Sequence, residues 1–160
     1  SSEKGTEELL EAFNHKELKG LALKIIGDGP LLNNLKNKYK NNNNFDFLGS
    51  IDNKEVLKII EKSTAVVTTT RLFEGQPTLL CEASSYGKPS IFPKTGGIME
   101  FFPKNYPLSF EQFNHYDLIK KINLTKTIDM SEVGYNNKEY ISRFLNEEKI
   151  ITLFKEVFTK

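Results

Sequence analysis

The chain has 160 residues, of which 38% are hydrophobic and 27% are charged, and its formal net charge is +1. This length and composition fit one folded domain with one core and exclude a disordered chain. The balanced charge offers no large field for a nucleic-acid backbone, and no run of about 18 apolar residues is present to span a membrane. We therefore expect a single domain over residues 1–160 that binds no nucleic acid.

Predicted helices and strands alternate along the first two thirds of the chain. Apolar residues at helical spacing, with Thr6 as the expected N-terminal cap, predict a helix over residues 6–13. Residues 21–26 predict a strand, which the turn-forming residues 27–30 end. Further helices are predicted over residues 31–39, 53–63, 77–86 and 98–102, and further strands over residues 45–48, 64–69, 89–92 and 108–110. Such alternation predicts a parallel sheet.

The two ends of the chain differ from this alternation. From residue 116 onward the pattern is helical, with helices expected near residues 116–124, 133–140 and 147–158. The chain also starts in a helix, whereas an open α/β sheet usually starts with a strand. The predicted fold class is therefore α/β, a Rossmann-like three-layer domain with a parallel sheet, whose first strand is expected upstream of residue 1.

Cysteine and histidine usage gives little support for redox or metal chemistry. Cys81 is the only cysteine and stands in an apolar helical stretch, so we expect a small buried side chain. His15 and His115 show no metal-ligand spacing, and we predict no metal. The sequence also lacks a glycine-rich dinucleotide fingerprint and a Walker-type Gly-Lys-Ser/Thr motif.

The loop over residues 70–76 is the strongest candidate for ligand contact. In open parallel sheets, ligands bind at the carboxyl ends of the strands, and this loop is the longest and most polar of the segments expected there. It leads into the helix predicted to start near Pro77, whose first free N–H groups, at Thr78 and Leu79, would favour a phosphate. Gly75 has no side chain and would let a ligand approach the backbone.

Two carboxylates, Glu74 and Glu82, flank that helix start. We expect them to line one cleft, where they would accept hydrogen bonds from sugar hydroxyls. The alternative is that Glu82 is solvated on a helix face and Glu74 is an ordinary loop residue, and these two residues alone favour neither reading. Arg71 and the Asp28-Gly29 turn could also contact a ligand, but an exposed loop arginine and a plain turn are favoured.

An ordered series of short motifs runs along residues 3–103. The motifs are Glu3-Lys4-Gly5, Gly27-Asp28-Gly29-Pro30, Phe47-Leu48-Gly49, Phe73-Glu74-Gly75, Glu82-Ala83, Gly87-Lys88-Pro89 and Thr95-Gly96-Gly97-Ile98-Met99-Glu100. With the seven residues that separate Glu74 from Glu82, this series resembles the C-terminal domain of retaining GT-B glycosyltransferases of the glycogen-synthase-like, group 1 type. Gln76 and Pro77 stand where many relatives have a Phe-Gly-Leu-Pro-like run.

The resemblance implies roles for individual residues. Glu74 would face the donor sugar, Glu82 would bind the nucleotide ribose, and Lys4 would neutralise the diphosphate together with an arginine expected upstream of this chain. Glu74 and Lys4 are the implied catalytic residues. The implied donor-binding residues are Gly27, Pro30, Leu48, Glu74, Gly75, Gln76, Thr78, Leu79 and Glu82.

The implied reaction is transfer of a hexosyl-type sugar, with retention of configuration, from a UDP- or GDP-linked donor to a glycan or lipid-linked acceptor. Lysine, arginine and a helix dipole would stabilise the leaving diphosphate, so no cofactor is expected. The acceptor would bind to an N-terminal domain absent from this chain, which alone would be inactive. Alternatives are a nucleotide-sugar 2-epimerase and a non-catalytic nucleotide-sugar-binding module; a nicotinamide-dependent enzyme is disfavoured.

Residue usage hints at the source. The chain is rich in lysine, asparagine and isoleucine and contains only two arginines, Arg71 and Arg143, as in proteins of AT-rich bacterial genomes. We expect a role in polysaccharide biosynthesis and a cytoplasmic location. This location would include the inner face of the cytoplasmic membrane, through peripheral association of the full enzyme.

Overall fold

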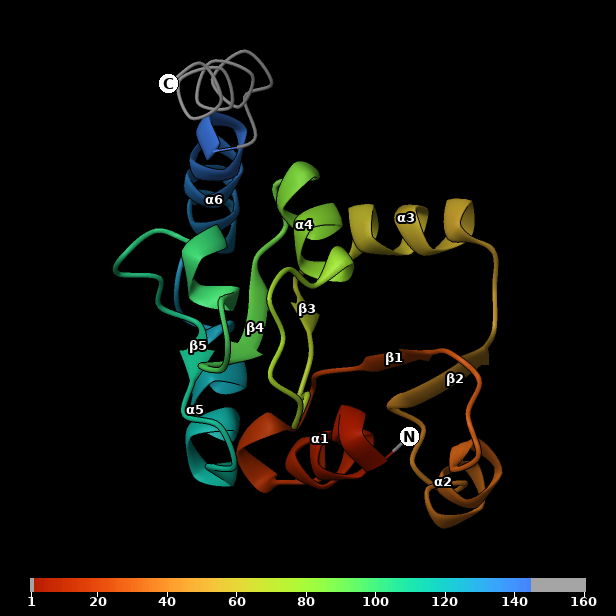
Figure 1. The fold of residues 1–160 in the computed structure, drawn as a ribbon. Coiled ribbons are helices and arrows are strands. Elements are labelled where there is room, and N and C mark those ends of the chain that lie inside the picture. Colours follow the sequence, from red (N-terminus) through yellow and green to blue (C-terminus); the bar gives the residue numbers. More distant parts are fainter. Residues whose placement is uncertain (1, 145–160) are drawn as a thin grey trace.

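The computed structural model of the chain describes residues 2–144, which form helices and strands in alternation (Figure 1). The strands are β1 (Leu23–Ile26), β2 (Phe45–Gly49), β3 (Val66–Val67), β4 (Ser90–Pro93) and β5 (Ser109–Phe110). The α-helices are α1 (Thr6–Phe13), α2 (Leu32–Lys38), α3 (Asn53–Lys62), α4 (Thr78–Ser85), α5 (His115–Leu124) and α6 (Met130–Phe144). The 3-10 helices are η1 (Ser2–Lys4), η2 (Lys16–Leu18) and η3 (Ile98–Phe101). The helix predicted over residues 147–158 lies outside the described residues.

The strands form two parallel sheets, which confirms the α/β class with parallel strands. One sheet contains β1 and β2, and the other has the order β3-β4-β5. In Figure 1, β1 and β2 run across the picture while β4 and β5 run down it. Within the described residues β1 pairs only with β2, and β3 pairs with β4. The predicted continuous sheet is thus divided between β1 and β3, and the first strand expected upstream of residue 1 stays a prediction.

The three-stranded sheet carries the densest packing. All four residues of β4 are buried, and the ring of Phe92 lies 4.2 Å from that of Phe102 and 5.6 Å from that of Tyr106, measured between centroids. The Tyr106 hydroxyl donates to the carbonyl of Ser90 at 2.9 Å and accepts from its N–H at 2.7 Å. Burial raises the pKa of Tyr106 well above its usual value, so this hydroxyl stays protonated and anchors the start of β4.

The two-stranded sheet is less buried. Leu23 is the only buried residue of β1 and β2. Lys24 and Asp46, which lie opposite each other, form an exposed ion pair at 2.8 Å. Phe45 packs edge to face against Tyr39 of the segment after α2. Phe13 of α1 packs edge to face against the same Phe45 ring, so aromatic side chains from α1 and from the end of α2 cover the start of β2.

The start of α1 is fixed by Gly5 and not by Thr6, which was the predicted cap. Gly5 is the N-cap, in the left-handed region at a φ of 66°, and no side chain caps the helix. A Cβ at this position would overlap the carbonyl oxygen of Thr69, and the Thr69 hydroxyl donates to the Gly5 carbonyl at 2.8 Å. Because only glycine tolerates both constraints, the chain passes close to the end of β3 and places Lys4 there.

The last described helix packs on α4. A Cβ on Gly134 would overlap the carbonyl oxygen of Gly87, so the two elements meet at backbone distance. The buried Asn137 donates from Nδ2 to the hydroxyl of Ser84 at 2.5 Å. Asp129 accepts hydrogen bonds from the backbone of two residues in the first turn, which explains why α6 starts earlier than the predicted residues 133–140.

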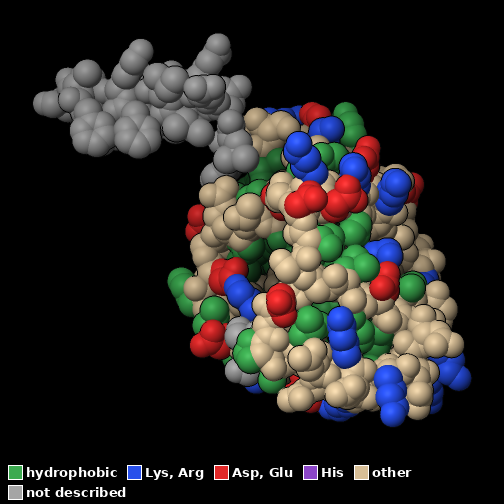
Figure 2. All heavy atoms as spheres, turned by 90° about the vertical axis from the view of Figure 1, so that its right-hand side faces the viewer, with side chains coloured by type: hydrophobic (Ala, Val, Ile, Leu, Met, Phe, Trp, Pro, Cys, Tyr) green, Lys and Arg blue, Asp and Glu red, His purple; other side chains and the backbone are tan. Residues whose placement is uncertain are grey.

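The surface carries charges of both signs. On the face shown in Figure 2, which is the right-hand side of Figure 1, lysine and acidic side chains are interspersed with apolar ones. This face has no extended patch of one sign. Within residues 2–144, no helix is both long and apolar enough to cross a bilayer.

Candidate functional site

A cavity of about 410 Å³ lies at the start of α4, and it collects residues that are far apart in the sequence. It is lined by Lys4, Thr68, Glu74, Gln76, Pro77, Thr78, Leu79 and Leu80. Five of the predicted site residues are thereby brought together by η1, the end of β3, the following loop and α4. They are Lys4, Glu74, Gln76, Thr78 and Leu79.

An ion pair stands at one side of this cavity. The ammonium of Lys4 donates to Oε1 of Glu74 at 2.7 Å, although the two residues are 70 positions apart. Burial raises the pKa of the Glu74 carboxyl, but the hydrogen bonds from Lys4 and Thr70 outweigh it, so the pKa lies below its ordinary value. Glu74 is therefore a carboxylate at neutral pH, and it is mostly shielded, with 21% of its side chain exposed.

The backbone of Glu74 is held by the turn after β4. The N–H of Gly97 donates to the Glu74 carbonyl at 3.0 Å. Gly96 adopts a φ of 57°, and a Cβ there would overlap the same carbonyl oxygen. A side chain at this position would be strained and would collide with Glu74. The Gly96-Gly97 pair of the sequence thus supports the candidate site from a different strand.

The start of α4 presents free backbone donors. Pro77 is the N-cap, and its carbonyl accepts from Leu80 and Cys81. The N–H groups of Thr78 and Leu79 donate to no group among the described residues. Because a helix N-terminus also carries partial positive charge, this side of the cavity suits an anion, as the sequence predicts.

The remaining residues of the loop lie beside the cavity. Around Gly75, no atom lies within 4 Å of the position that a Cβ would take, so this flank is open to a ligand. Gln76 donates from Nε2 to the sulfur of Cys81 at 3.5 Å, and Cys81 is half-buried, less than predicted. Arg71 turns to Glu8 on α1, with 3.6 Å between Nη2 and Oε2, and it does not line the cavity.

Besides Gly75, which lies beside it, four predicted residues do not line this cavity: Gly27, Pro30, Leu48 and Glu82. The first three lie on or after the strands of the other sheet, where the N–H of Gly27 donates to the Gly49 carbonyl at 2.8 Å. The Oε1 of Glu82 accepts from Nδ2 of Asn53 on α3 at 3.2 Å. Glu74 lines the cavity whereas Glu82 bonds to α3, and the single cleft expected to be lined by both carboxylates stays a prediction.

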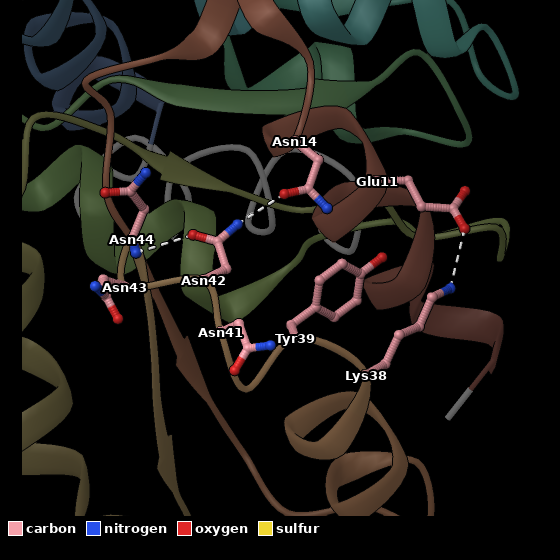
Figure 3. Close-up of a pocket in the computed structure, with 8 residues that line it drawn as sticks. All are labelled: Glu11, Asn14, Lys38, Tyr39, Asn41, Asn42, Asn43 and Asn44. Atoms are coloured by element: carbon pink, nitrogen blue, oxygen red, sulfur yellow. Dashed lines mark hydrogen bonds and ion pairs between the residues drawn. The ribbon is translucent and has the colours of Figure 1, made fainter.

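A larger hollow of about 780 Å³ lies elsewhere, around the asparagine run before β2 (Figure 3). Asn42 donates from Nδ2 to Oδ1 of Asn14 at 2.7 Å, and its own Oδ1 accepts from the N–H of Asn44 at 3.0 Å. The buried Tyr39 hydroxyl makes no hydrogen bond to a described residue, and Figure 3 shows it directed toward α1. These amides mainly tie α1 to the loop after α2, and the hollow contains none of the predicted site residues.

Sequence reasoning missed two residues that matter to the site. Thr68 lines the cavity, and the hydroxyl of Thr70 donates to Oε1 of Glu74 at 2.8 Å. Both lie at or beyond the end of the predicted strand over residues 64–69, where a β-branched residue is expected for packing alone. Their position at the carboxyl end of a strand was the available signal. Within residues 2–144, no group of three or more metal-ligating side chains is present.

Comparison with known proteins gives consistent matches at the level of fold. The chain resembles HepE from Anabaena in complex with UDP, with a TM-score of 0.81 at 19% identity over 99% of this chain and 46% of that one. It also resembles a mutant of TarM from S. aureus in complex with Fondaparinux, alpha-GlcNAc-glycerol and UDP, with a TM-score of 0.84 at 21% identity over 99% of this chain and 33% of that one. The chain thus spans less than half the length of either protein.

A third structure is matched over most of its length. It is the catalytic domain of cholesterol-alpha-glucosyltransferase from Helicobacter pylori, with a TM-score of 0.74 at 23% identity over 91% of this chain and 92% of that one. Comparison with curated protein sequences found no match. The model of the family "Glycosyl transferases group 1" matches residues 1–139. The chain therefore belongs to the group 1 glycosyl transferases.

Proposed function

We propose that the chain is the donor-binding domain of a retaining glycosyltransferase and that it holds a nucleoside-diphosphate sugar in the cavity at the start of α4. The observation that carries this proposal is the meeting of the Lys4 ammonium and the Glu74 carboxylate, 2.7 Å apart, beside the free N–H groups of Thr78 and Leu79. One side of the cavity suits a diphosphate and the other suits a sugar. The UDP bound in the HepE and TarM structures supports the choice of ligand class.

The diphosphate would bind at the start of α4. Two backbone N–H groups and the positive end of the helix favour phosphate oxygens, and the ammonium of Lys4 lies within reach of the same space. When the bond to the sugar breaks, negative charge grows on the leaving diphosphate. Fixed donors aimed at that charge lower the barrier because they need no reorganisation.

The donor sugar would bind against Glu74. Its Oε1 is occupied by Lys4 and Thr70, whereas its Oε2 accepts no hydrogen bond from any described residue. A carboxylate oxygen in this position accepts hydrogen bonds from sugar hydroxyls. We further propose that Glu82 binds the ribose and that Gly27, Pro30 and Leu48 flank the base, as their places at strand ends suggest.

The acceptor would be supplied by another part of the full enzyme. We propose a glycan or lipid-linked acceptor held by an N-terminal domain, consistent with a chain that spans 46% of HepE. Polysaccharide biosynthesis in the bacterial cytoplasm, at the inner face of the membrane, is the setting we propose. Product analysis of the full enzyme would distinguish glycosyl transfer from epimerisation, because an epimerase would release a free epimer without any acceptor.

Calorimetric titration with UDP, GDP and ADP, each free and as its glucose derivative, tests the donor site. We expect one nucleotide to bind, and Lys4→Ala to weaken both its free and sugar-linked forms roughly tenfold or more through loss of a charge-assisted contact. Glu74→Gln should weaken the sugar-linked form alone, since removal of a negative charge does not disfavour the diphosphate.

Lys24→Ala is the matched control, because Lys24 also forms a single exposed ion pair but lies on β1, away from the cavity. It should leave binding unchanged. If none of the six compounds binds, or if the Lys24 variant loses affinity as much as the Lys4 variant, the proposed donor site is wrong.

A further inference from the structure

Thr70 is a fully buried hydroxyl residue next to the candidate site. Its exposed fraction is 0%, and it follows β3 by three positions. A buried hydroxyl costs free energy unless it is hydrogen-bonded. Here Oγ1 donates to Oε1 of Glu74 at 2.8 Å and accepts from the N–H of Leu72 at 3.2 Å. Since the N–H of Leu72 can only donate, the hydroxyl proton points toward the carboxylate.

The position of Thr70 is itself fixed by the neighbouring strand end. Its carbonyl accepts from Nε2 of Gln112, in the segment after β5, at 3.3 Å. The residue before it, Thr69, bonds to Gly5 at 2.8 Å. Thr70 is therefore held from both sides and presents a rigid donor to Glu74.

The two donors to Oε1 of Glu74 differ in freedom. Lys4 carries its ammonium on a flexible side chain that is 56% exposed, and a diphosphate in the cavity would compete for that ammonium. Thr70 has no access to the solvent and no other acceptor among the described residues. If Lys4 turns to phosphate, the contact from Thr70 remains.

We propose that Thr70 is a positioning residue, which keeps Oε1 of Glu74 in place and leaves Oε2 facing the donor sugar when Lys4 engages the diphosphate. This inference rests on the proposed donor site. Thr70 would act through Glu74 and would not itself touch the ligand. Loss of its hydroxyl should consequently weaken binding of the sugar part of the donor and not of the diphosphate.

Two substitutions separate the hydroxyl from the shape of the side chain. Thr70→Val keeps nearly the same volume and removes the hydroxyl, and Thr70→Ser keeps the hydroxyl. With UDP and UDP-glucose as probes, we expect the Val variant to lose roughly fivefold to tenfold in affinity for UDP-glucose, as for one hydrogen bond. Its affinity for UDP should stay within about twofold of the wild type, and the Ser variant should match the wild type for both. An equal loss for UDP and UDP-glucose would overturn the proposal, because it would indicate a general distortion.

A measurement on the free chain tests the contact without any ligand. Carboxyl carbon NMR titration of the glutamates should show a higher pKa for Glu74 in Thr70→Val than in the wild type, since a hydrogen bond to the carboxylate is lost. Thr70→Ser should restore it. The charged group that contacts this carboxylate, Lys4 on η1, is the same in all three proteins.

The two measurements distinguish the inference from the donor site on which it rests. An unchanged pKa of Glu74 in the Val variant would overturn the role of Thr70 even if UDP-glucose binds well. A raised pKa of Glu74 in the Val variant, together with no binding of UDP or UDP-glucose to the wild type, would instead contradict the UDP-sugar site. The part of the inference that concerns the donor would then also be wrong. The hydrogen bond by which Thr70 positions Glu74 would still be supported.

Discussion

The two sheets of the molecule differ in how firmly they are built. The β3-β4-β5 sheet buries every residue of β4 and backs it with an aromatic cluster around Phe92. The β1-β2 sheet leaves most of its residues half-buried or exposed. The residues proposed to bind the sugar and the diphosphate lie next to the β3-β4-β5 sheet. Those proposed to flank the base lie on or after the strands of the β1-β2 sheet. The phosphate side of the candidate site is thus preorganised, and the base side is not assembled around the same cavity.

The largest expected effect is the loss of an aromatic ring from the firmer sheet. Phe92→Ala should lower the free energy of unfolding by about 3–5 kcal/mol, because it removes a fully buried ring and leaves a cavity. Phe47→Ala, the same change on β2 where the ring is only half-buried, should cost roughly half as much or less. Urea denaturation measures both.

Equal losses for these two variants would remove the distinction between the sheets. If Phe92→Ala does not fold, Phe92→Leu gives a smaller loss at the same position and keeps the comparison with Phe47→Leu measurable.

The second prediction concerns the turn that holds Glu74. Gly96→Ala should destabilise the chain by about 2–4 kcal/mol, because Ala is strained at a φ of 57° and its Cβ would overlap the Glu74 carbonyl. Gly75→Ala is the stability control, since its Cβ would meet no atom within 4 Å, and it should stay within about 1 kcal/mol of the wild type. A Gly96 variant as stable as the Gly75 variant would show that this turn does not support the site.

The third prediction concerns the anchor at the start of β4. Tyr106→Phe should cost about 1–3 kcal/mol, because the buried N–H and carbonyl of Ser90 both lose their hydrogen-bond partner. Tyr116→Phe removes a hydroxyl from a side chain that is 77% exposed and should change stability by less than about 0.5 kcal/mol. Thermal unfolding followed by circular dichroism compares the two, and similar melting temperatures would contradict the anchoring role.

The smallest effect is expected on the softer sheet. Asp46→Asn removes the exposed ion pair with Lys24 and should cost no more than about 1 kcal/mol. Because salt screens exposed charges, the difference should shrink when thermal unfolding is repeated at high ionic strength. A large loss that persists in salt would mean that the β1-β2 sheet depends on this pair and not on its apolar cover.

Local signals in the sequence predicted the parts of the site that depend on neighbouring residues. Pro77 before an apolar helical pattern was enough to place free N–H groups at Thr78 and Leu79. Lys4 came only from the resemblance, since a lysine next to the first helix has no local signal for a partner 70 residues away. Thr70 and Gly96 were missed as contacts of Glu74. Burial of a hydroxyl and close approach of two loop backbones do not change the hydrophobic periodicity of the sequence, so the pattern could not predict them.

Long-range pairing explains the other differences. The strand predicted over residues 64–69 is limited to Val66–Val67. Beyond it, the hydroxyls of Thr69 and Thr70 bond to Gly5 and Glu74, which the sequence pattern did not predict. The alternation of elements predicted parallel strands correctly. It could not predict that β1 and β3 would not pair.

The most direct test of the candidate site is a nitrogen-15 NMR titration of the chain with UDP and UDP-glucose. We expect both ligands to shift the amide signals of Thr78 and Leu79, and UDP-glucose to shift those around Glu74 as well. The signals of Asn41 to Asn44 at the larger hollow should not move. Shifts centred on those asparagines, or no shift at the start of α4 with either ligand, would contradict a nucleotide-sugar site between Lys4, Glu74 and α4.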